Sequence, residues 1–425
     1  MWVPSRRRLM GVALAAVTLL AAWGNAAEDL EVRGFGTGTV GGAGGRVLMV
    51  TRLDDDAEKP APGMLRWALL QKGPRVIRFA KSGTIGLEAP LRLERGGQVT
   101  VDGASAPAAG ITLTGWAVEF SRCEDVILTH LRIRNGSREV RRWLRKEKLE
   151  RPRGSHGLDC VELRECRRVV LDHLSLEWSC DELLAVIRCQ DVTVQHCLMA
   201  EPLAGTALHP YGDRHAFGIL ASASTLTLHH CVLAHYWMRG PQFEANDRRH
   251  GDTWPVRMEA VANLFADFGR SGSRITAGVE DHRDEAVGAR FDFHLVGNAY
   301  LDCGGTKRAI ELVTKHGWHP GVHCWAAENW WQPQGTEGFQ PGAPVALEDG
   351  TPWKKAGSPW RRVMVAGPLF ESPATPSPDL GGDGLARLLE EAGCSRERDA
   401  VDQRIVEEVK QRLVRPVTTR PRTRR

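Results

Sequence analysis

The stretch HGLDCVELRECRRVVLDHLSLEWSCDELLAVIRCQDVTVQHC, residues 156–197, decides the fold of this chain. Two short runs rich in valine and leucine begin within it, RRVVLDHLSL and QDVTVQHCLM, and such runs are typical of buried strands. Acidic residues lie where these strands begin or end, namely Asp159, Asp172, Asp181 and Glu182. Because rigid strands can hold polar groups in a fixed geometry, we expect the functional site here.

The pattern of this stretch recurs along the chain. Cys123, Cys166 and Cys189 each stand seven residues before a histidine. Aligning the repeats predicts one column of polar residues, made of His130, His173, His196, His230, Asn263, Asn298 and Asn329. A short unit with irregular insertions is typical of a solenoid, and the absence of helical runs between the strands favours a parallel β-helix.

The repeated polar and thiol positions have structural interpretations. A polar residue at the same bend of each coil can hydrogen-bond to its neighbours up the stack, whereas ligands spread along a stack would not converge on one metal ion. The chain has 10 cysteines. Their repeated position predicts columns of buried thiols rather than a disulfide framework.

The beginning of the chain has the features of an export signal. Arg6, Arg7 and Arg8 precede an apolar run, so residues 1–26 are predicted to be a signal peptide of either the twin-arginine or the ordinary secretory kind. No later apolar run is long enough to span a membrane, so we expect a soluble protein that is secreted or periplasmic. The β-helix domain is predicted over 27–374.

Three further segments carry predictions of their own. MLRWALLQ, residues 64–71, is predicted to be a helix that caps the first coil, and residues 375–425 a C-terminal helical segment with a basic tail. The basic run at 137–153 is either a solvated surface helix or an approach for an anionic polymer. Tryptophans near the C-terminal end either stack on sugar rings or cover the core, and they are Trp318, Trp325, Trp330 and Trp331.

Several blocks in succession resemble one known family. GFGTGTVGGAGG, PGMLRWAL, GPRVIRF, VTVDGASAPAAGI, VVLDHLSLEWSCDE, HHCVLAH and RGP follow in the order found in secreted, bacterial-type pectate lyases of the first polysaccharide lyase family. The resemblance spans most of the chain, from about Gly34 to Arg398. It implies a right-handed, single-stranded parallel β-helix that binds Ca²⁺ and cleaves pectate by β-elimination.

The resemblance also assigns site residues. Asp159 and Asp181 match two of the family's calcium ligands, but Ala185 stands where a third aspartate is expected. Arg239, in an R-x-P setting, matches the catalytic arginine. Three positions are assigned to substrate binding, with departures from the family pattern at each: Tyr211, Arg214 and Gln242.

The chemistry of such a site is removal of the proton next to a uronate carboxylate, with a hard cation stabilising the charge that develops. Arg239 would either take the proton, as the family's arginine does, or pair with that charge. Alternation along a strand would point Glu182 away from Asp181. The predicted partner is an acidic polysaccharide, with no nucleic acid and no membrane span, and we expect a monomer. Because the site is incomplete, two alternatives stay open: a non-catalytic carbohydrate-binding or structural β-helix, and a lyase or hydrolase that acts on another polyuronate.

Overall fold

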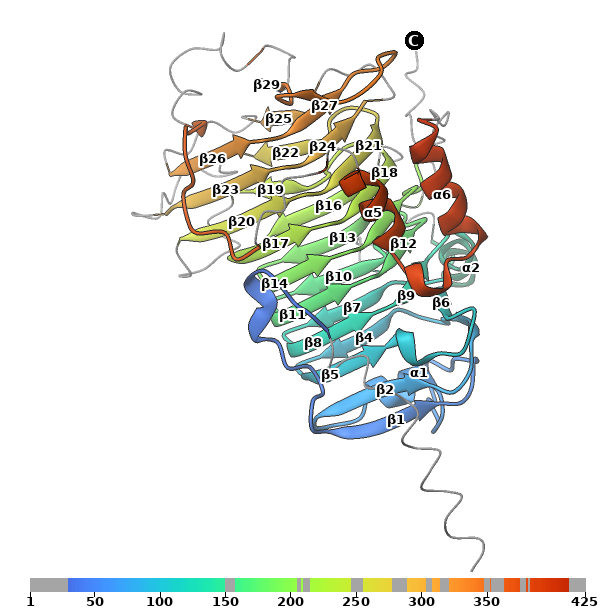
Figure 1. Cartoon of the computed structure of the whole chain (residues 1–425). Helices are drawn as coiled ribbons and strands as arrows, with labels where there is room; N and C mark the ends of the chain where they lie inside the picture. Colours follow the sequence, from blue (N-terminus) through green and yellow to red (C-terminus); the bar gives the residue numbers. More distant parts are fainter. Residues whose placement is uncertain are drawn as a thin grey trace, which may run out of the picture. The chain divides into compact units, whose positions relative to one another are not determined.

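Parallel strands stacked coil upon coil make up most of the computed structural model (Figure 1). The structure describes residues 30–149, 157–204, 208, 215–245, 255–276, 289–302, 308–313, 321–347, 352, 363–374, 380 and 383–412. Residues 1–26, the predicted signal peptide, and the basic tail from 413 lie outside the described residues.

The described strands form three sheets. Sheet A contains β1 (Arg46–Val50), β2 (Arg75–Phe79), β5 (Gly97–Asp102), β8 (Glu124–Thr129), β11 (Arg167–Asp172), β14 (Gln190–Gln195), β17 (Thr225–His229), β20 (Val256–Val261), β23 (Phe291–Val296) and β26 (Val322–Ala327). Sheet B contains β3 (Gly83–Gly86), β6 (Ile111–Thr114), β9 (Leu131–Arg134), β12 (Ser175–Glu177), β15 (Leu198–Ala200), β18 (Val232–Tyr236), β21 (Leu264–Phe268), β24 (Ala299–Leu301), β27 (Trp330–Gln332) and β28 (Gln340–Pro341). Sheet C contains β4 (Leu91–Glu94), β7 (Val118–Ser121), β10 (Val161–Arg164), β13 (Glu182–Ile187), β16 (Phe217–Ser222), β19 (Gln242–Glu244), β22 (Ser273–Thr276), β25 (Ile310–Val313) and β29 (Val345–Leu347).

Each coil takes one strand from each sheet in turn. β10, β11 and β12 follow one another in sequence, and each pairs in parallel with the strand three places later, β13, β14 and β15 respectively. Inward-facing residues of successive coils, such as Leu184 and Ile219, meet in one continuous core because strand neighbours point to opposite faces. The parallel β-helix predicted from the sequence is therefore confirmed.

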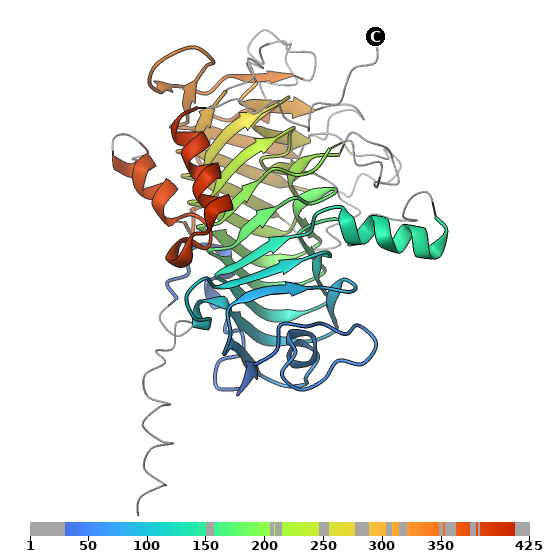
Figure 2. The same ribbon diagram turned by 90° about the vertical axis from the view of Figure 1, so that its right-hand side faces the viewer.

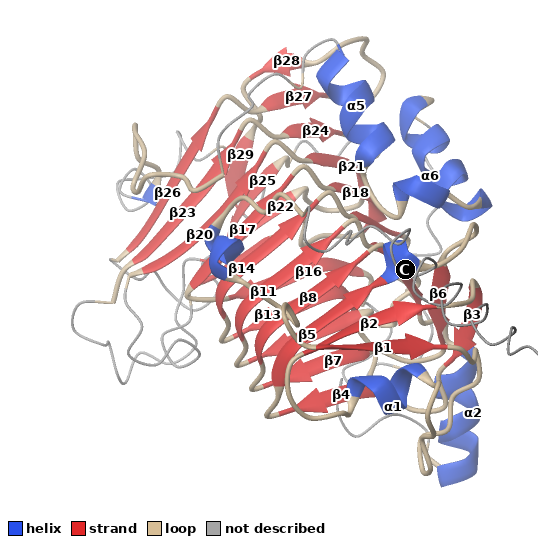
Figure 3. Cartoon of the chain, turned by 60° about the horizontal axis from the view of Figure 1, so that its bottom comes forward, coloured by secondary structure: helices blue, strands red, loops and turns tan. Residues whose placement is uncertain are grey.

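Helices cover parts of the stack (Figure 3). The predicted capping helix is confirmed as α1 (Leu65–Leu69), which buries Leu65 and Leu69 in the core beside the first strands. The C-terminal segment forms α5 (Asp383–Glu391) and α6 (Ala400–Lys410). Their apolar side chains, among them Leu389 and Ile405, pack against Leu198 and its counterparts on the outer face of sheet B. The predicted C-terminal helical segment is thus also confirmed.

The glycine-rich segment before β1 lies close against sheet A. The Gly42 N–H donates to Thr100 Oγ1 at 3.0 Å, and a Cβ built on Gly42 would lie 1.8 Å from the carbonyl oxygen of Arg75. Only a residue without a side chain fits so close to another backbone. This segment is therefore used for packing and tight turns.

The thiol positions agree with the sequence prediction. All the described cysteines are free and buried, with Cys123, Cys166 and Cys189 on successive coils. The Cys166 N–H lies 3.4 Å from Cys189 Sγ, one coil further on. No disulfide joins cysteines within the described residues.

The predicted polar column is in fact two columns, offset by one residue. His196 and His230 occupy left-handed bend positions with φ of 52° each, and the residue that follows each of them points into the core. Val232 pairs with Leu264, so Asn263 is the counterpart of Cys231 and not of His230. The alignment of the asparagines with the histidines was wrong because both positions adjoin the same bend, where an offset of one residue leaves the sequence pattern almost unchanged.

The asparagines form a buried hydrogen-bonded ladder. Asn263 donates from its backbone N and from Nδ2 to Asn298 Oδ1, at 3.0 and 2.9 Å. Asn298 donates in the same way to Asn329 Oδ1, and its Nδ2 also donates to the Ala260 carbonyl at 2.8 Å. The hydrogen-bonding role expected for these residues is confirmed.

Replacing Asn298 by alanine is expected to lower the free energy of unfolding by about 2–4 kcal/mol, because it leaves several buried backbone and amide groups without partners. Urea denaturation would measure the change. Gln403→Ala, at an exposed position of α6, is the matched control and should change it by less than about 0.5 kcal/mol. Equal stability of the two variants would contradict a structural role for the ladder.

Candidate functional site

Three carboxylates from two adjacent coils meet at the start of sheet C. Asp159 lies two residues before β10, Asp181 lies directly before β13, and Glu182 is the first residue of β13. Each offers one oxygen within 4.8 Å of the others, and all three residues are buried. Figure 1 shows β10 and β13 as neighbours in the middle of the stack. We call these residues the carboxylate triplet.

The expectation that Glu182 points away from Asp181 is wrong. Asp181 belongs to the turn before the strand, so the alternation that starts at Glu182 does not apply to it. The Glu182 N–H donates to Asp159 Oδ1 at 3.0 Å, which links the two coils through the site itself. Ser179 Oγ donates to the Asp181 carbonyl at 3.1 Å, within the turn that precedes the strand.

Arg239 reaches the carboxylate triplet from the turn before β19. Its Nη1 donates to Glu182 Oε1, and its guanidinium carbon lies 4.1 Å from the centre of the Phe217 ring. A carboxylate and the face of an aromatic ring both stabilise a cation. The structure therefore brings together the predicted catalytic arginine and the predicted metal ligands.

His215 is a site residue that the sequence argument missed. Its Nδ1 lies 2.8 Å from Asp181 Oδ1, and its ring packs against Phe217 with centroids 4.7 Å apart. The histidine stands two residues before β16, just as Asp159 stands two residues before β10. In the strand register, however, the counterparts of Asp159 are Glu182 and Phe217, so no repeated position identified His215 in the sequence, and only the folded turn brings it to Asp181.

Burial, reinforced by the repulsion between neighbouring charges, disfavours the ionised form of the carboxylate triplet. Burial, together with the charges of Glu182 and Asp181, raises the pKa of Asp159 well above its ordinary value. Burial and Asp181 likewise raise the pKa of Glu182, although the ion pair with Arg239 opposes the shift. Three buried carboxylates this close together disfavour one another's ionised form, so the site favours either bound protons or a cation.

The donor set of the carboxylate triplet fits calcium. Ca²⁺ takes carboxylate and other oxygen ligands in flexible arrangements, and a divalent cation would neutralise the charge that raises these pKa values. Asp159, Asp181 and Glu182 would hold the ion, which adds Glu182 to the two ligands expected from the sequence. The third expected position, Ala185, lies on β13 beside Glu162 of β10, so a carboxylate of the neighbouring strand adjoins it.

Of the three predicted substrate-binding residues, the structure describes only Gln242. Gln242 begins β19, where its Oε1 accepts from Arg274 at 3.1 Å and its Nε2 donates to Glu244 at 2.9 Å. Tyr211 and Arg214 lie outside the described residues. Their assignment to substrate therefore stays a prediction.

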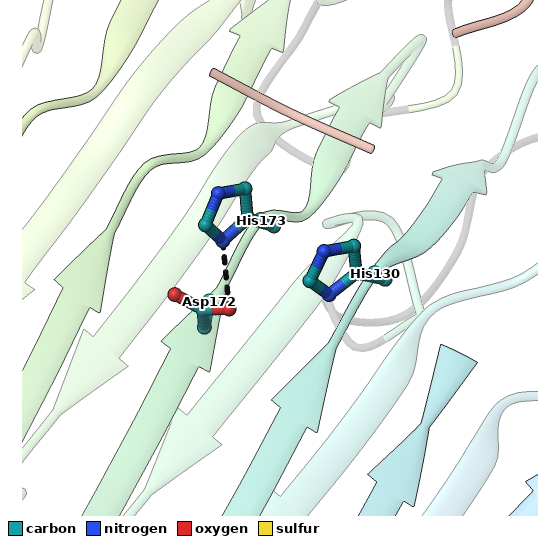
Figure 4. A group of neighbouring side chains, drawn as sticks. All are labelled: His130, Asp172 and His173. Atoms are coloured by element: carbon teal, nitrogen blue, oxygen red, sulfur yellow. Dashed lines mark hydrogen bonds and ion pairs between the residues drawn. The ribbon is translucent and has the colours of Figure 1, made fainter. Parts of the chain in front are cut away.

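A second group of side chains with metal-binding chemistry lies at the bend after sheet A, and consists of His130, Asp172 and His173 (Figure 4). The two imidazole rings stack with centroids 4.7 Å apart and an interplanar angle of 10°. Lone pairs on parallel rings lie in parallel planes and do not converge on one ion. Asp172 accepts from Thr129, His173 and Gln195 at 2.8–3.0 Å, and burial lowers the pKa of His130 to about 4. This group is accounted for as a structural stack.

The C-terminal tryptophans favour the core interpretation. Trp331 is buried in the main core, and Trp330 packs against the cluster that holds α5 and α6. Trp325 meets His294 edge to face, with centroids 5.1 Å apart. Trp318 lies outside the described residues.

Together these features define a parallel β-helix protein with a buried carboxylate–arginine site on one sheet. A comparison with models of known protein families finds no match. In sequence the chain is 24% identical over 377 residues to the probable pectate lyase C of Aspergillus flavus, covering 88% of this chain and 75% of that protein. It is also 30% identical to a tobacco (Nicotiana tabacum) pectate lyase over 167 residues, which cover 39% of this chain and 41% of that one.

Solved structures support the fold. The pectate lyase of Paenibacillus sp. 0602 matches with a TM-score of 0.53 and 12% identity, over 88% of this chain and 98% of that one. A pectate lyase studied for its anti β-elimination mechanism matches with a TM-score of 0.50 and 11% identity, over 86% and 97% of the two chains.

Proposed function

We propose that this chain is a secreted polysaccharide lyase that cleaves pectate or a related polyuronate by calcium-assisted β-elimination. The observation that carries the proposal is the carboxylate triplet held against Arg239 on adjacent coils of sheet C. Its support from relatives is the similarity, over most of the chain, to proteins named pectate lyases. The missing third aspartate at Ala185 makes this an incomplete version of the site in the first polysaccharide lyase family.

In the reaction, the proton on the carbon next to a uronate carboxylate passes to a hydroxide ion from the solvent. The electron pair of that carbon–hydrogen bond forms a carbon–carbon double bond, the bond from the neighbouring carbon to the glycosidic oxygen breaks, and that oxygen takes up a proton from water. Asp159, Asp181 and Glu182 would hold the calcium ion, whose charge stabilises the negative charge that develops on the substrate carboxylate. Burial keeps water from these side chains, which strengthens each electrostatic interaction at the site.

Arg239 is the catalytic residue in this proposal. A guanidinium is protonated in proteins. Its contribution to catalysis is therefore to pair with the negative charge that develops on the substrate, and not to accept the proton as a neutral base. The contacts with Glu182 and Phe217 orient it for that task. Substrate binding by Tyr211, Arg214 and Gln242 belongs to the same proposal.

The proposed partner is an acidic polysaccharide, and the protein is proposed to act as an exported monomer. Export rests on Arg6–Arg8 and the apolar run that follows them. Within the described residues, no helix has the length and apolar character that crossing a membrane requires.

De-esterified pectate with added calcium provides the test. Ultraviolet absorbance of the unsaturated product should rise with time, and a chelator should stop the rise. Absence of the signal across a pH series, in protein that still binds pectate, would contradict the lyase proposal.

A non-catalytic carbohydrate-binding β-helix is the second candidate function. The observation that favours it is Ala185, which removes one expected oxygen ligand from the site. If the protein is a binding protein, pectate binds without any change in its chain length, whereas a lyase shortens it. Size-exclusion analysis of the polymer therefore distinguishes the binding function from the lyase function.

A helix with exposed basic residues precedes the site in sequence, and its charge supports the proposal that the partner is acidic. α2 (Arg138–Glu147) is anchored by buried Val140 and Leu144, while its basic residues Arg138, Arg141, Arg142, Arg145 and Lys146 are exposed. Figure 2 shows this helix projecting from the side of the stack. The sequence prediction of a surface helix here is confirmed, and its role in polymer approach is part of the proposal.

Reversing two charges, with Arg141→Glu and Arg145→Glu together, is expected to raise the KM for pectate about tenfold at low salt. The difference should shrink as salt is raised, because exposed charges are screened beyond about 10 Å at 0.1 M. The control pair Arg387→Glu and Lys410→Glu, on α5 and α6, should leave KM unchanged. A salt-independent KM in all three proteins would contradict the role of α2.

A further inference from the structure

An open cavity lies near the N-terminal end of the stack, away from the carboxylate triplet. Its volume is about 730 Å³, and pockets of about 300 to 1,000 Å³ are the usual size for small-molecule ligands. The cavity is bounded by the turn after α1, residues 70–73, and by the end of β4 with the turn into β5, residues 92–98. We call it the basal cavity.

A buried cation, Arg75, forms part of the wall of the basal cavity and is 1% exposed. Its guanidinium donates to backbone carbonyls: Nε to Ala68 at 3.2 Å, Nη1 to Gly73 and Gly97 at 2.9 and 3.1 Å, and Nη2 to Leu69. No carboxylate of the described chain pairs with it. Burial lowers the pKa of Arg75, because the charged form is poorly solvated there. The carbonyls satisfy its N–H groups without neutralising its charge, so an anion in the cavity would be favourable.

Arg95 is a second cation of the basal cavity. Arg95, Arg122, Glu165 and Arg188 occupy the same bend after sheet C in four successive coils, with φ of 50–54°. Within this row, Arg122 Nη1 lies 3.7 Å from Glu165 Oε2, and Arg188 donates to Glu165 Oε1. Arg95 stands at the lower end of the row, where the described residues offer it no carboxylate partner. Its side chain is exposed, so it can meet a ligand in the cavity.

The acidic residues of the basal cavity are already paired with arginines that do not line it. Glu94 accepts from Arg122, and Glu124 Oε1 lies 2.6 Å from Arg168 Nη2. Lys72, in the turn after α1, adds a third cation that is exposed and has no ion pair within the described part of the chain. The cavity therefore presents more positive charge than its own carboxylates compensate.

The rest of the lining has the chemistry that a sugar acid needs. Leu70 is 46% exposed, and together with Leu93 it offers apolar surface for the C–H face of a sugar ring. Gln71 and Gln98 carry amide groups, which can bond to hydroxyls as donors or acceptors. A ligand with carboxylates, hydroxyls and an apolar ring face matches this combination of side chains.

We propose that the basal cavity binds a short oligouronate at a site separate from the carboxylate triplet. The choice of a uronate rests on the proposed function, whereas the charge and the lining of the cavity do not. The carboxylate triplet lies where strands of sheet C begin, and the cavity lies beyond the end of β4, two strands before β10 in that sheet. An oligouronate held here leaves the carboxylate triplet accessible, so the cavity would anchor acidic polysaccharide outside the active site.

The test uses the full chain with Lys72 and Arg95 both replaced by glutamine, which leaves the buried Arg75 in place. Binding of trigalacturonate is measured by titration calorimetry with a chelator present, so that neither calcium nor catalysis contributes. We expect the double variant to bind about 10-fold more weakly than the wild type, because two contacts between exposed charges are lost. Fully methyl-esterified trigalacturonate, which has no charge, should bind the two proteins equally weakly.

The matched control is Arg387→Gln together with Lys410→Gln, which removes two exposed cations from α5 and α6 and should leave the affinity unchanged. Thermal melting verifies that each variant is folded. At saturating pectate the Lys72 and Arg95 variant should keep the wild-type lyase rate, because neither residue contacts the carboxylate triplet.

The basal site would be overturned by undetectable binding of trigalacturonate to the wild type, by equal affinity in the double variant, or by an equal loss in the control. Inorganic phosphate that binds as tightly as trigalacturonate would overturn the assignment to a sugar acid. If the wild type shows no lyase activity but binds trigalacturonate through Lys72 and Arg95, the basal site stands and the proposed function falls. If lyase activity is present and the double variant binds like the wild type, the proposed function stands and the basal site falls.

Discussion

Replacing Arg239 by alanine is expected to reduce kcat/KM on pectate by about 1000-fold or more, with the fold unchanged. Removing one preorganised charge-stabilising group from an active site costs roughly 100-fold to 1000-fold, and the alanine also leaves Glu182 without its ion pair. Initial rates of unsaturated product, measured with calcium present, would show the loss.

The matched control for this variant is Arg290→Ala, which should retain wild-type rates. Arg239→Lys keeps the charge but not the planar fork, and is expected to recover part of the lost activity. A fully active Arg239→Ala protein would remove this residue from the mechanism.

Replacing Asp159 by asparagine is expected to weaken calcium binding roughly 100-fold, because affinity follows the number and charge of the oxygen ligands. Asparagine Oδ1 can still accept the hydrogen bond from the Glu182 N–H, so the local fold should persist. The wild type should gain about 2.7 kcal/mol of stability when calcium is present at 100 times its dissociation constant. The variant should gain almost nothing at that concentration.

The calcium effect should depend on pH with a defined sign. Burial and neighbouring carboxylates raise the pKa values of Asp159 and Glu182, so the folded protein without metal holds protons that the unfolded chain releases above about pH 4. Stability without metal therefore falls as pH rises above that value. Because calcium needs the ionised ligands, its stabilising effect should be larger at pH 8 than at pH 5.

Melting temperatures with and without calcium at the two pH values would measure this dependence. Asp125→Asn, in a partly buried ion pair with Arg168 on sheet A, is the control and should keep the full calcium effect whatever its own stability. The same calcium effect in Asp159→Asn and in the wild type would mean that the ion binds elsewhere.

Most of the fold could be predicted from the sequence because equivalent residues of successive coils are of the same type and pack or hydrogen-bond with one another. The valine and leucine runs, the buried thiols and the asparagines each recur at fixed places in successive coils. The sequence alignment matched Asn263 with the wrong residue of the preceding coil. Such an error shows the limit of sequence alignment here, because only the strand register resolves an offset of one residue.

The candidate site could be predicted only in part. Asp159 and Asp181 were identified, but Glu182 was set aside because the strand boundary at that residue was not visible in the sequence. His215 lies on a different coil from the Asp181 side chain that it contacts. In the same way, Arg270 reaches Glu311 from the preceding coil, so only the stacking of coils produces either contact. Such contacts depend on register and turn length rather than on any local motif.

The most direct test of the central claim is mass analysis of the products formed from pectate in water labelled with heavy oxygen. We predict unsaturated chain ends that contain no label, formed by the wild type with calcium and not by Arg239→Ala. New non-reducing ends that are saturated, or polymer that stays intact while bound to the wild-type protein in the presence of calcium, would contradict a calcium-assisted lyase.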